Sequence, residues 1–99
     1  MIDAEVYGKA LFELAAENGT AAKINSEIED VCLLLKENER YCTLVDSPAI
    51  SFSERLALLS EAFEGSVDPY LMNFISILCR KHSMYKFAKC AEAYSSCYQ

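Results

Sequence analysis

The sequence lacks the residue patterns on which most catalytic, metal-binding and nucleotide-binding sites depend. Its three glycines, Gly8, Gly19 and Gly65, stand far apart, so no glycine-rich loop is present to hold a phosphate. The five cysteines form no C-x-x-C pair and are accompanied by one histidine, which excludes a disulfide framework and a zinc site. As a general base, His82 would need a nucleophile and an orienting partner, and the sequence pattern supplies neither. We expect it instead to be an exposed residue at a helix C-terminus, where the helix dipole favours it. We therefore expect a non-catalytic protein without metal or cofactor, its thiols free in a reducing compartment.

Positive charge and long apolar runs are also scarce. Nine basic residues stand against fifteen acidic ones, a net charge of −6, which argues against a nucleic-acid partner because such binding needs clustered Lys and Arg. No apolar run approaches the roughly 18–20 residues of a membrane span; the longest candidate, residues 70–79, is interrupted by Asn73 and Ser76. The first residues carry neither the basic nor the apolar region of a secretory signal. We expect no nucleic-acid partner and no direct membrane insertion.

Apolar residues at helical spacing are what the sequence has in abundance. They make up 53% of the 99 residues, above the roughly 45–50% of an ordinary soluble domain. The length suits one domain rather than two, and no alternating strand pattern competes with the helical periodicity. We predict an all-α fold, a single six-helix bundle with short loops that spans residues 1–99.

Residues typical of helix ends divide the chain into these six segments. Gly19 suits the left-handed position after a first helix over residues 3–18, and a proline after a carboxylate at 68–69 is typical of a helix start. A capping box is expected where a serine and a glutamate stand three residues apart. The predicted capping residues are Thr20, Ser51 with Glu54, Asp68 with Pro69, and Ser83. The predicted inner face of the last helix is Tyr85, Phe87, Ala88, Ala91 and Tyr94.

Two of the predicted helices carry more apolar surface than a small bundle needs. In the helix over 3–18, the clearly solvated line is restricted to Glu5, Lys9, Glu13 and Glu17, so the apolar stripe is wider than the roughly 100° of a surface helix. The helix over 70–79 is apolar nearly all round. A stripe this wide must be covered on two sides, either by other helices of the domain or by a partner.

Three segments resemble one known family. Residues 7–15, Tyr-Gly-Lys-Ala-Leu-Phe-Glu-Leu-Ala, are similar to the opening Y-A-K-A-L-F-x-L-A of the ATP synthase delta subunit, which is called OSCP in mitochondria. Residues 47–51 are similar to its S-P-A-I-S turn, and residues 73–78 to the N-F-L-x-L-L of its fifth helix. The segments follow the family's order and spacing, and the similarity covers essentially the whole chain. The family commonly has Gly-Arg after helix 5, where this chain has His82-Ser83, so any contact of that arginine is unsupported here.

The resemblance implies a stator component rather than an enzyme. The family's N-terminal domain is a six-helix bundle that sits on the catalytic head and grips an N-terminal helix of an alpha subunit. Its C-terminal part joins the b subunit of the peripheral stalk, so that the head cannot turn with the rotor. We accordingly expect the 99 residues to be the N-terminal domain of a longer subunit, held at the cytoplasmic side of the cell membrane as a peripheral part of the complex.

The resemblance also implies where the partner binds, because the family's groove lies between helices 1 and 5. Those are the two helices with excess apolar surface. For Leu11, Phe74 and Leu78, a place in the core between the two helices is an equal alternative to a place in the groove. The expected partner-binding residues are Tyr7, Ala10, Leu11, Leu14, Tyr70, Asn73, Phe74, Ile77 and Leu78.

Two other functions stay open at this point. A helical adaptor or regulatory module unrelated to ATP synthesis would present the same kind of groove. The pair Asp46-Ser47 in a small acidic helical domain also resembles an acyl carrier protein, whose serine bears a phosphopantetheine arm. In that family the pair begins a helix and is usually followed by Leu, whereas Pro48 follows here and the pair is expected at a helix exit.

Overall fold

A computed structural model describes residues 2–99, and within that range it contains α-helices, one short 3-10 helix and no strands. The prediction of an all-α fold with six helices is therefore confirmed. None of these helices is long and apolar enough to cross a membrane. The elements are α1 (Ala4–Glu17), α2 (Ala21–Glu37), α3 (Glu39–Asp46), α4 (Phe52–Phe63), α5 (Pro69–Arg80), η1 (Met84–Lys86) and α6 (Phe87–Tyr98).

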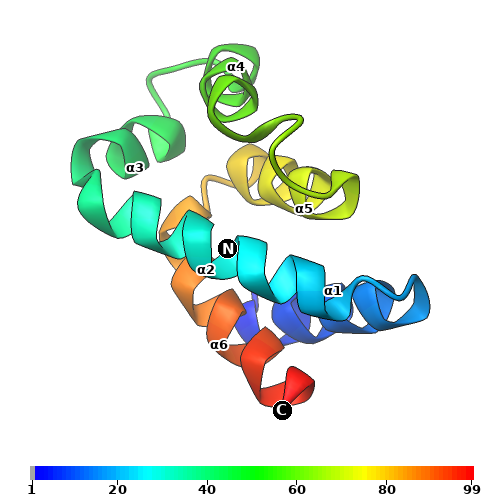
Figure 1. The fold of residues 1–99 in the computed structure, drawn as a ribbon. Helices are drawn as coiled ribbons and strands as arrows, with labels where there is room; N and C mark the ends of the chain where they lie inside the picture. Colours follow the sequence, from blue (N-terminus) through cyan, green and yellow to red (C-terminus); the bar gives the residue numbers. More distant parts are fainter. Residues whose placement is uncertain (1) are drawn as a thin grey trace.

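The helices form two groups that α5 connects (Figure 1). In the first group, α1 packs most extensively on α6, and α2 also lies on α6. In the second group, α3 packs on α4. Helix α5 contacts α4 of the second group and α1 of the first group. Each of these two helices covers part of its surface. The position of α5 relative to α1 therefore decides what surface the two helices leave open.

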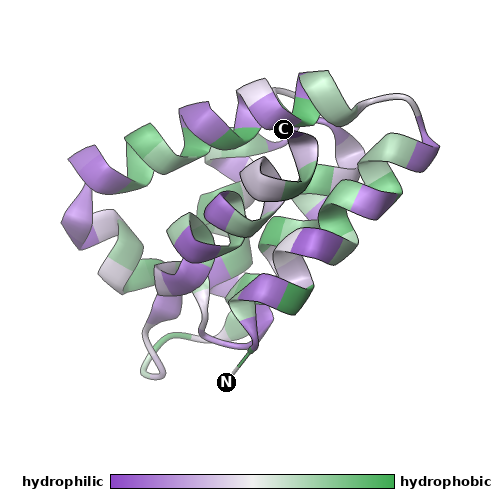
Figure 2. Cartoon of the chain, turned by 90° about the horizontal axis from the view of Figure 1, so that it is seen from below, coloured by the Kyte–Doolittle hydropathy of each residue, from purple (hydrophilic) through white to green (hydrophobic). Residues whose placement is uncertain are grey.

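The core lies where the apolar stripes of the helices meet. Hydrophobic and hydrophilic bands alternate along each helix, as amphipathic helices require (Figure 2). On α2 the buried positions Ile24, Ile28, Val31 and Leu35 recur every three or four residues, the spacing that places them on one face. Tyr94 of α6 is fully buried and packs edge-to-face on Phe12 of α1, with ring centroids 5.5 Å apart.

The helix ends confirm some of the predicted caps. Gly19 has a φ of +69°, the left-handed conformation expected after α1. The Asp68 carboxylate accepts a hydrogen bond from the Tyr70 amide, and Pro69 occupies the first position of α5. Ser51 accepts from the Glu54 amide at 3.2 Å. The return bond of a capping box, from Glu54 to the Ser51 amide, is not among the hydrogen bonds of residues 2–99, so Ser51 acts as a simple N-cap.

Two predicted caps are wrong because the hydroxyl groups of Thr20 and Ser83 bond backbone carbonyls instead of the first amides of the helix. Thr20 stands at the N-cap of α2, but its hydroxyl donates to the Ala15 carbonyl at 3.3 Å and caps nothing. The Ser83 hydroxyl bonds the Lys81 carbonyl. The amides after it are instead capped by Asp46 of α3, whose two carboxylate oxygens accept from Met84 and Tyr85 at 2.7 and 2.8 Å.

The predicted inner face of the last helix is wrong in part for a related reason. Residues 84–86 form a 3-10 turn with three residues per turn, so the helical phase begins at Phe87 rather than at Ser83. Tyr85 consequently points outward with 58% of its surface exposed. Ala88 is exposed as well, and Ala91 is half-buried. The buried positions of α6 are Phe87, Cys90 and Tyr94.

A buried cation holds the second group of helices together. Arg55 of α4 is only 2% exposed, yet none of the ion pairs found in residues 2–99 involves it. Its guanidinium donates to the carbonyls of Ile50 and Val45 at 3.0 and 3.2 Å, and to the carbonyl of Cys79. Val45 and Cys79 lie in the last turns of α3 and α5, where carbonyls carry the negative end of the helix dipole. Arg55 therefore fixes the C-terminal end of α5.

Candidate functional site

Helix α1 divides its apolar residues between two sides. One side is covered by α6, the helix that α1 contacts most, and Gly8 on this side lies directly against Cys90 of α6. On the other side the packing stops. Val6 remains 57% exposed, Ala10 is exposed, and neighbouring Tyr7 and Leu14 are only half-buried. The domain itself thus covers one side of the wide apolar stripe and leaves the other open.

Helix α5 has the same division. Leu71, Ile75 and Leu78 are fully buried against the rest of the bundle. On the neighbouring side, Tyr70 and Ile77 expose 41% and 37% of their surfaces, although both are large and hydrophobic. Asn73 on this side is exposed as well.

The open sides of α1 and α5 face each other and form a groove of about 340 Å³. None of its lining residues carries a charge, and Asn73 and the two tyrosines supply the only polar groups among them. Leu11 and Phe74 form its floor, because they are 4% and 7% exposed and yet belong to the lining. The lining residues are Val6, Tyr7, Ala10, Leu11, Leu14, Tyr70, Asn73, Phe74 and Ile77.

The structure brings eight of the nine predicted site residues together in this groove. The exception is Leu78, which is fully buried and absent from the lining, so the alternative of a core residue holds for it. Leu78 belongs to the buried core of the bundle and not to the surface of the groove. Val6 lines the groove although it was not predicted to do so. It stands one helical turn before Ala10, so the i, i+4 spacing could have identified it.

One end of the groove is closed by a polar contact between the two helices. The Tyr70 hydroxyl, in the first turn of α5, donates to the side-chain oxygen of Asn18, the residue after α1, over 3.4 Å. Helix α5 itself is anchored at this end, because Lys23 of α2 pairs with the Asp68 carboxylate at 3.2 Å and Glu27 accepts from the Asp68 amide. These contacts connect the start of α5 to the end of α1 and to α2 at this end of the groove.

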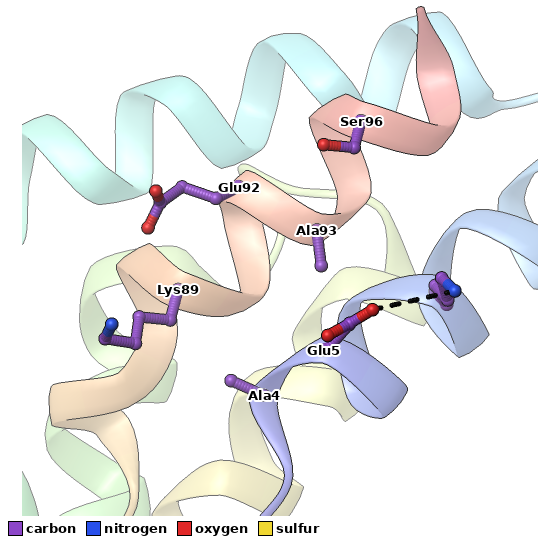
Figure 3. A pocket seen from close by; sticks show the side chains of 7 residues that line it. Ala4, Glu5, Lys89, Glu92, Ala93 and Ser96 are labelled. Carbon is purple, nitrogen blue, oxygen red and sulfur yellow. Dashed lines mark ion pairs between the residues drawn. The ribbon is translucent and has the colours of Figure 1, made fainter.

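Other hollows of the surface differ in their lining. The hollow between α1 and α6, shown in Figure 3, is bordered by Glu5, Lys9, Lys89 and Glu92, and the dashed line marks the Glu5–Lys9 ion pair of 3.7 Å. A larger hollow between α2 and α6 also includes charged side chains, among them Glu29 and Lys36. Only the hollow between α1 and α5, of these three, offers an uncharged surface to an apolar partner.

The candidate chemical groups lie elsewhere and are engaged in structural contacts. His82 is exposed after α5 and its Nδ1 lies 3.0 Å from the Asp46 carbonyl oxygen. Ser47 follows α3 and so lacks the helix-start position of a carrier serine. Burial raises the pKa of the Cys90 thiol to about 11. In the part of the chain from Ile2 onward, no three His, Cys, Asp or Glu side chains lie close enough to hold a metal ion.

Comparison with known proteins places the chain beside one family. Residues 4–99 match the family model described as ATP synthase delta (OSCP) subunit. The ATP synthase subunit delta of Cytophaga hutchinsonii is 32% identical over 76 residues, which cover 77% of this chain and 42% of that protein. The ATP synthase delta chain, chloroplastic, of Chlamydomonas reinhardtii is 28% identical over 95 residues, 95% of this chain and 43% of that protein. The chain thus spans less than half the length of these two curated relatives.

Proposed function

Because the chain belongs to the ATP synthase delta (OSCP) subunit family, we propose that it is a non-catalytic component of the peripheral stalk of an ATP synthase. In this role it binds the N-terminal helix of an alpha subunit in the groove between α1 and α5. This contact prevents the catalytic head from turning with the rotor, at the cytoplasmic side of the membrane. The b subunit of the stalk is contacted by a part of the subunit other than these 99 residues.

The uncharged groove is the observation that carries this proposal. Of the seven large hydrophobic residues with substantial exposure among residues 2–99, three line it, namely Val6, Tyr70 and Ile77. An amphipathic helix lays its apolar residues into such a groove at intervals of three and four positions. Ala10 in the middle of the groove wall leaves room for the approach of a partner helix, whose axis would lie about 8–10 Å from that of α1.

The energetics of this binding mode favour an apolar groove over a charged one. An alpha segment that folds on binding loses roughly 2–5 kcal/mol in ordering. Burial of apolar area returns roughly 25 cal/mol for each Å² removed from water, and Ile77, Tyr70 and Val6 are exposed enough to supply part of that area. A stator contact under sustained torque needs a slow dissociation, which an apolar interface core provides.

Titration of the alpha N-terminal peptide into the 99-residue chain tests the proposal. We expect Ile77→Asp to abolish binding, because a carboxylate buried without a partner costs several kcal/mol. Leu33→Asp is the matched control, since Leu33 is also a large exposed apolar residue but lies on α2, outside the groove. Calorimetry that showed equal affinity for the two variants would exclude the groove as the binding site.

A second variant fills the groove rather than charging it. Ala10 is exposed in the groove wall, so Ala10→Trp should leave the bundle folded while its indole occupies the space that the partner needs. We expect unchanged circular dichroism and thermal unfolding together with a strongly reduced peptide affinity. Unchanged affinity would show that the partner binds on another face.

A further inference from the structure

The hollow between α2 and α6 is a second surface with a large exposed apolar residue. Leu33 of α2 leaves 55% of its surface open to solvent. The apolar residues that line this hollow are Ile28, Cys32, Leu33, Ala88 and Ala91. The hollow has a volume of about 550 Å³ and shares no lining residue with the groove between α1 and α5. It is therefore a surface separate from the groove.

Three charged side chains complete the lining of this hollow. Glu29 stands on α2 and Glu92 on α6, while Lys36 lies in the last turn of α2, and all three are exposed. Glu29 accepts a hydrogen bond from Asn25 of its own helix at 3.3 Å. The charged residues nearby on the two helices that do not line the hollow are Asp30, Glu37 and Lys89. None of the three ion pairs found from Ile2 to Gln99 includes Glu29, Lys36 or Glu92, so each hollow offers one ammonium group and two carboxylates to a partner.

The charges on α2 lie at equal distances from the apolar centre of the helix. Glu29 is three residues before Cys32, and Lys36 is three residues after Leu33. The lining residues of α2, at positions 25, 28, 29, 32, 33 and 36, have the spacing of one helix face. Two copies of α2 that lie antiparallel, related by a two-fold axis between positions 32 and 33, place Glu29 of each copy opposite Lys36 of the other. This face of α2 is therefore complementary to itself.

Helix α6 adds to this complementarity. It runs in the direction opposite to α2, because the Tyr94 hydroxyl in its second half donates to the carbonyl of Ala21, the first residue of α2 (Figure 1). Glu92 and Glu29 both stand near the middle of their helices, on the two walls of the hollow. A lysine of a second copy that reaches Glu29 therefore also approaches Glu92. The one lysine of each hollow is matched by two carboxylates of the other copy.

We infer that the chain associates with a second copy of itself as a symmetric dimer through the hollow between α2 and α6. Leu33 of each copy is then covered by the apolar lining of the other. The inference is independent of the proposed function, because the hollow and the groove have no residue in common. A contact made by two helices of each copy belongs to the small interfaces, below about 1,200 Å² in total, which are weak. We therefore expect a dimer that dissociates on dilution.

Sedimentation equilibrium of the 99-residue chain between about 10 µM and 1 mM tests the inference. An ionic strength of about 0.15 M limits the repulsion between two copies of net charge −6, because the Debye length is then about 8 Å. The average mass should rise with concentration from that of one chain toward that of two. Leu33→Asp should remain a monomer, whereas Ile77→Asp, the matched control in the groove, should associate as the parent chain does. A parent chain that stays monomeric, or association that Ile77→Asp abolishes and Leu33→Asp retains, would overturn the inference.

A charge reversal tests the antiparallel pairing. Lys36→Glu places a carboxylate against Glu29 and Glu92 of the other copy, and the two-fold axis repeats the change, so the dissociation constant should rise about five- to tenfold. Lys81→Glu is the control, because Lys81 is exposed at the end of α5, lies outside the hollow and gives the same net charge. Reversal of all three charges, in Lys36→Glu/Glu29→Lys/Glu92→Lys, should restore association. Equal dissociation constants of Lys36→Glu and Lys81→Glu would contradict the antiparallel contact.

Discussion

Gly8 of α1 lies against the backbone of α6 at Cys90, with no space between them for a methyl group. A Cβ atom at position 8 would press on the Cys90 carbonyl oxygen and stand 2.7 Å from the Cβ of Ala93. The glycine thus permits the close packing of α1 on α6, which is the most extensive helix pair of the bundle. This contact fixes the side of α1 that faces away from α6, and with it the wall of the groove.

Gly8→Ala should therefore destabilise the domain, although alanine is the better helix former. The substitution gains about 1 kcal/mol of helix propensity. Overpacking against a backbone atom costs about 1–3 kcal/mol, because a carbonyl in a helix cannot move aside as a flexible side chain would. We expect a net loss of up to about 2 kcal/mol, the difference between the two terms, measured by urea denaturation. The double variant Gly8→Ala/Ala93→Gly should recover little, since the Cys90 carbonyl remains; full recovery would contradict the role assigned to that backbone contact.

The sequence predicted the structural features that are determined by residues close to one another in the chain. The helix start at Asp68-Pro69 and the end at Gly19 are set by contacts within a few residues, so their pattern was sufficient to place them. The excess apolar surface singled out the two helices, and the family resemblance implied that a groove lies between them. The place of Leu78 was ambiguous, because the helical spacing alone does not distinguish a residue of the core from a residue of the groove wall. The structure buries it fully.

What the sequence did not predict depends on contacts between distant residues. Nothing near Arg55 marks it as buried, because two of its three carbonyl acceptors belong to other helices, at Val45 and Cys79, 10 and 24 residues away. Asp46 caps amides 38 and 39 residues later, and no local pattern encodes that distance. Local capping rules therefore assigned the role to Ser83, the nearest residue of a suitable type.

Asp46→Ala should lower the free energy of unfolding by about 1–2 kcal/mol, the usual cost of a lost N-cap. Both of its carboxylate oxygens accept backbone bonds, so the amides of Met84 and Tyr85 lose their partner together. Asp46→Asn retains one acceptor oxygen and should lose less than the alanine variant. Hydrogen exchange of the Met84 and Tyr85 amides provides the site-specific measurement. Unchanged exchange in Asp46→Ala would show that another group caps this turn.

Arg55→Met should be among the most destabilising substitutions outside the apolar core. The side chains are similar in length, but the change leaves the buried carbonyls of Val45 and Cys79 without the guanidinium. The Cys79 carbonyl still accepts from the His82 amide at 3.1 Å, so the main loss is at the Val45 carbonyl, and a buried acceptor left without its partner costs about 1–3 kcal/mol. Arg40→Met is the control, because Arg40 is exposed and has no partner among the ion pairs of residues 2–99. Equal thermal stabilities of the two variants would contradict the structural role of Arg55.

Two tyrosines should make the domain unstable in alkali. Burial raises the pKa of Tyr94 and of Tyr41 from 10.0 to about 12, and their hydroxyls donate to the carbonyls of Ala21 and Leu58. Between these values the unfolded chain loses protons that the folded chain keeps, so the stability provided by the protonated phenols is complete below pH 10 and falls as the pH rises toward 12. The thiol of Cys90 adds to the slope from pH 9.0 upward, because its pKa is raised to about 11. Denaturation at a series of pH values should show a shallower decline above pH 10 in Tyr41→Phe/Tyr94→Phe than in the parent chain, and identical slopes would contradict the assignment.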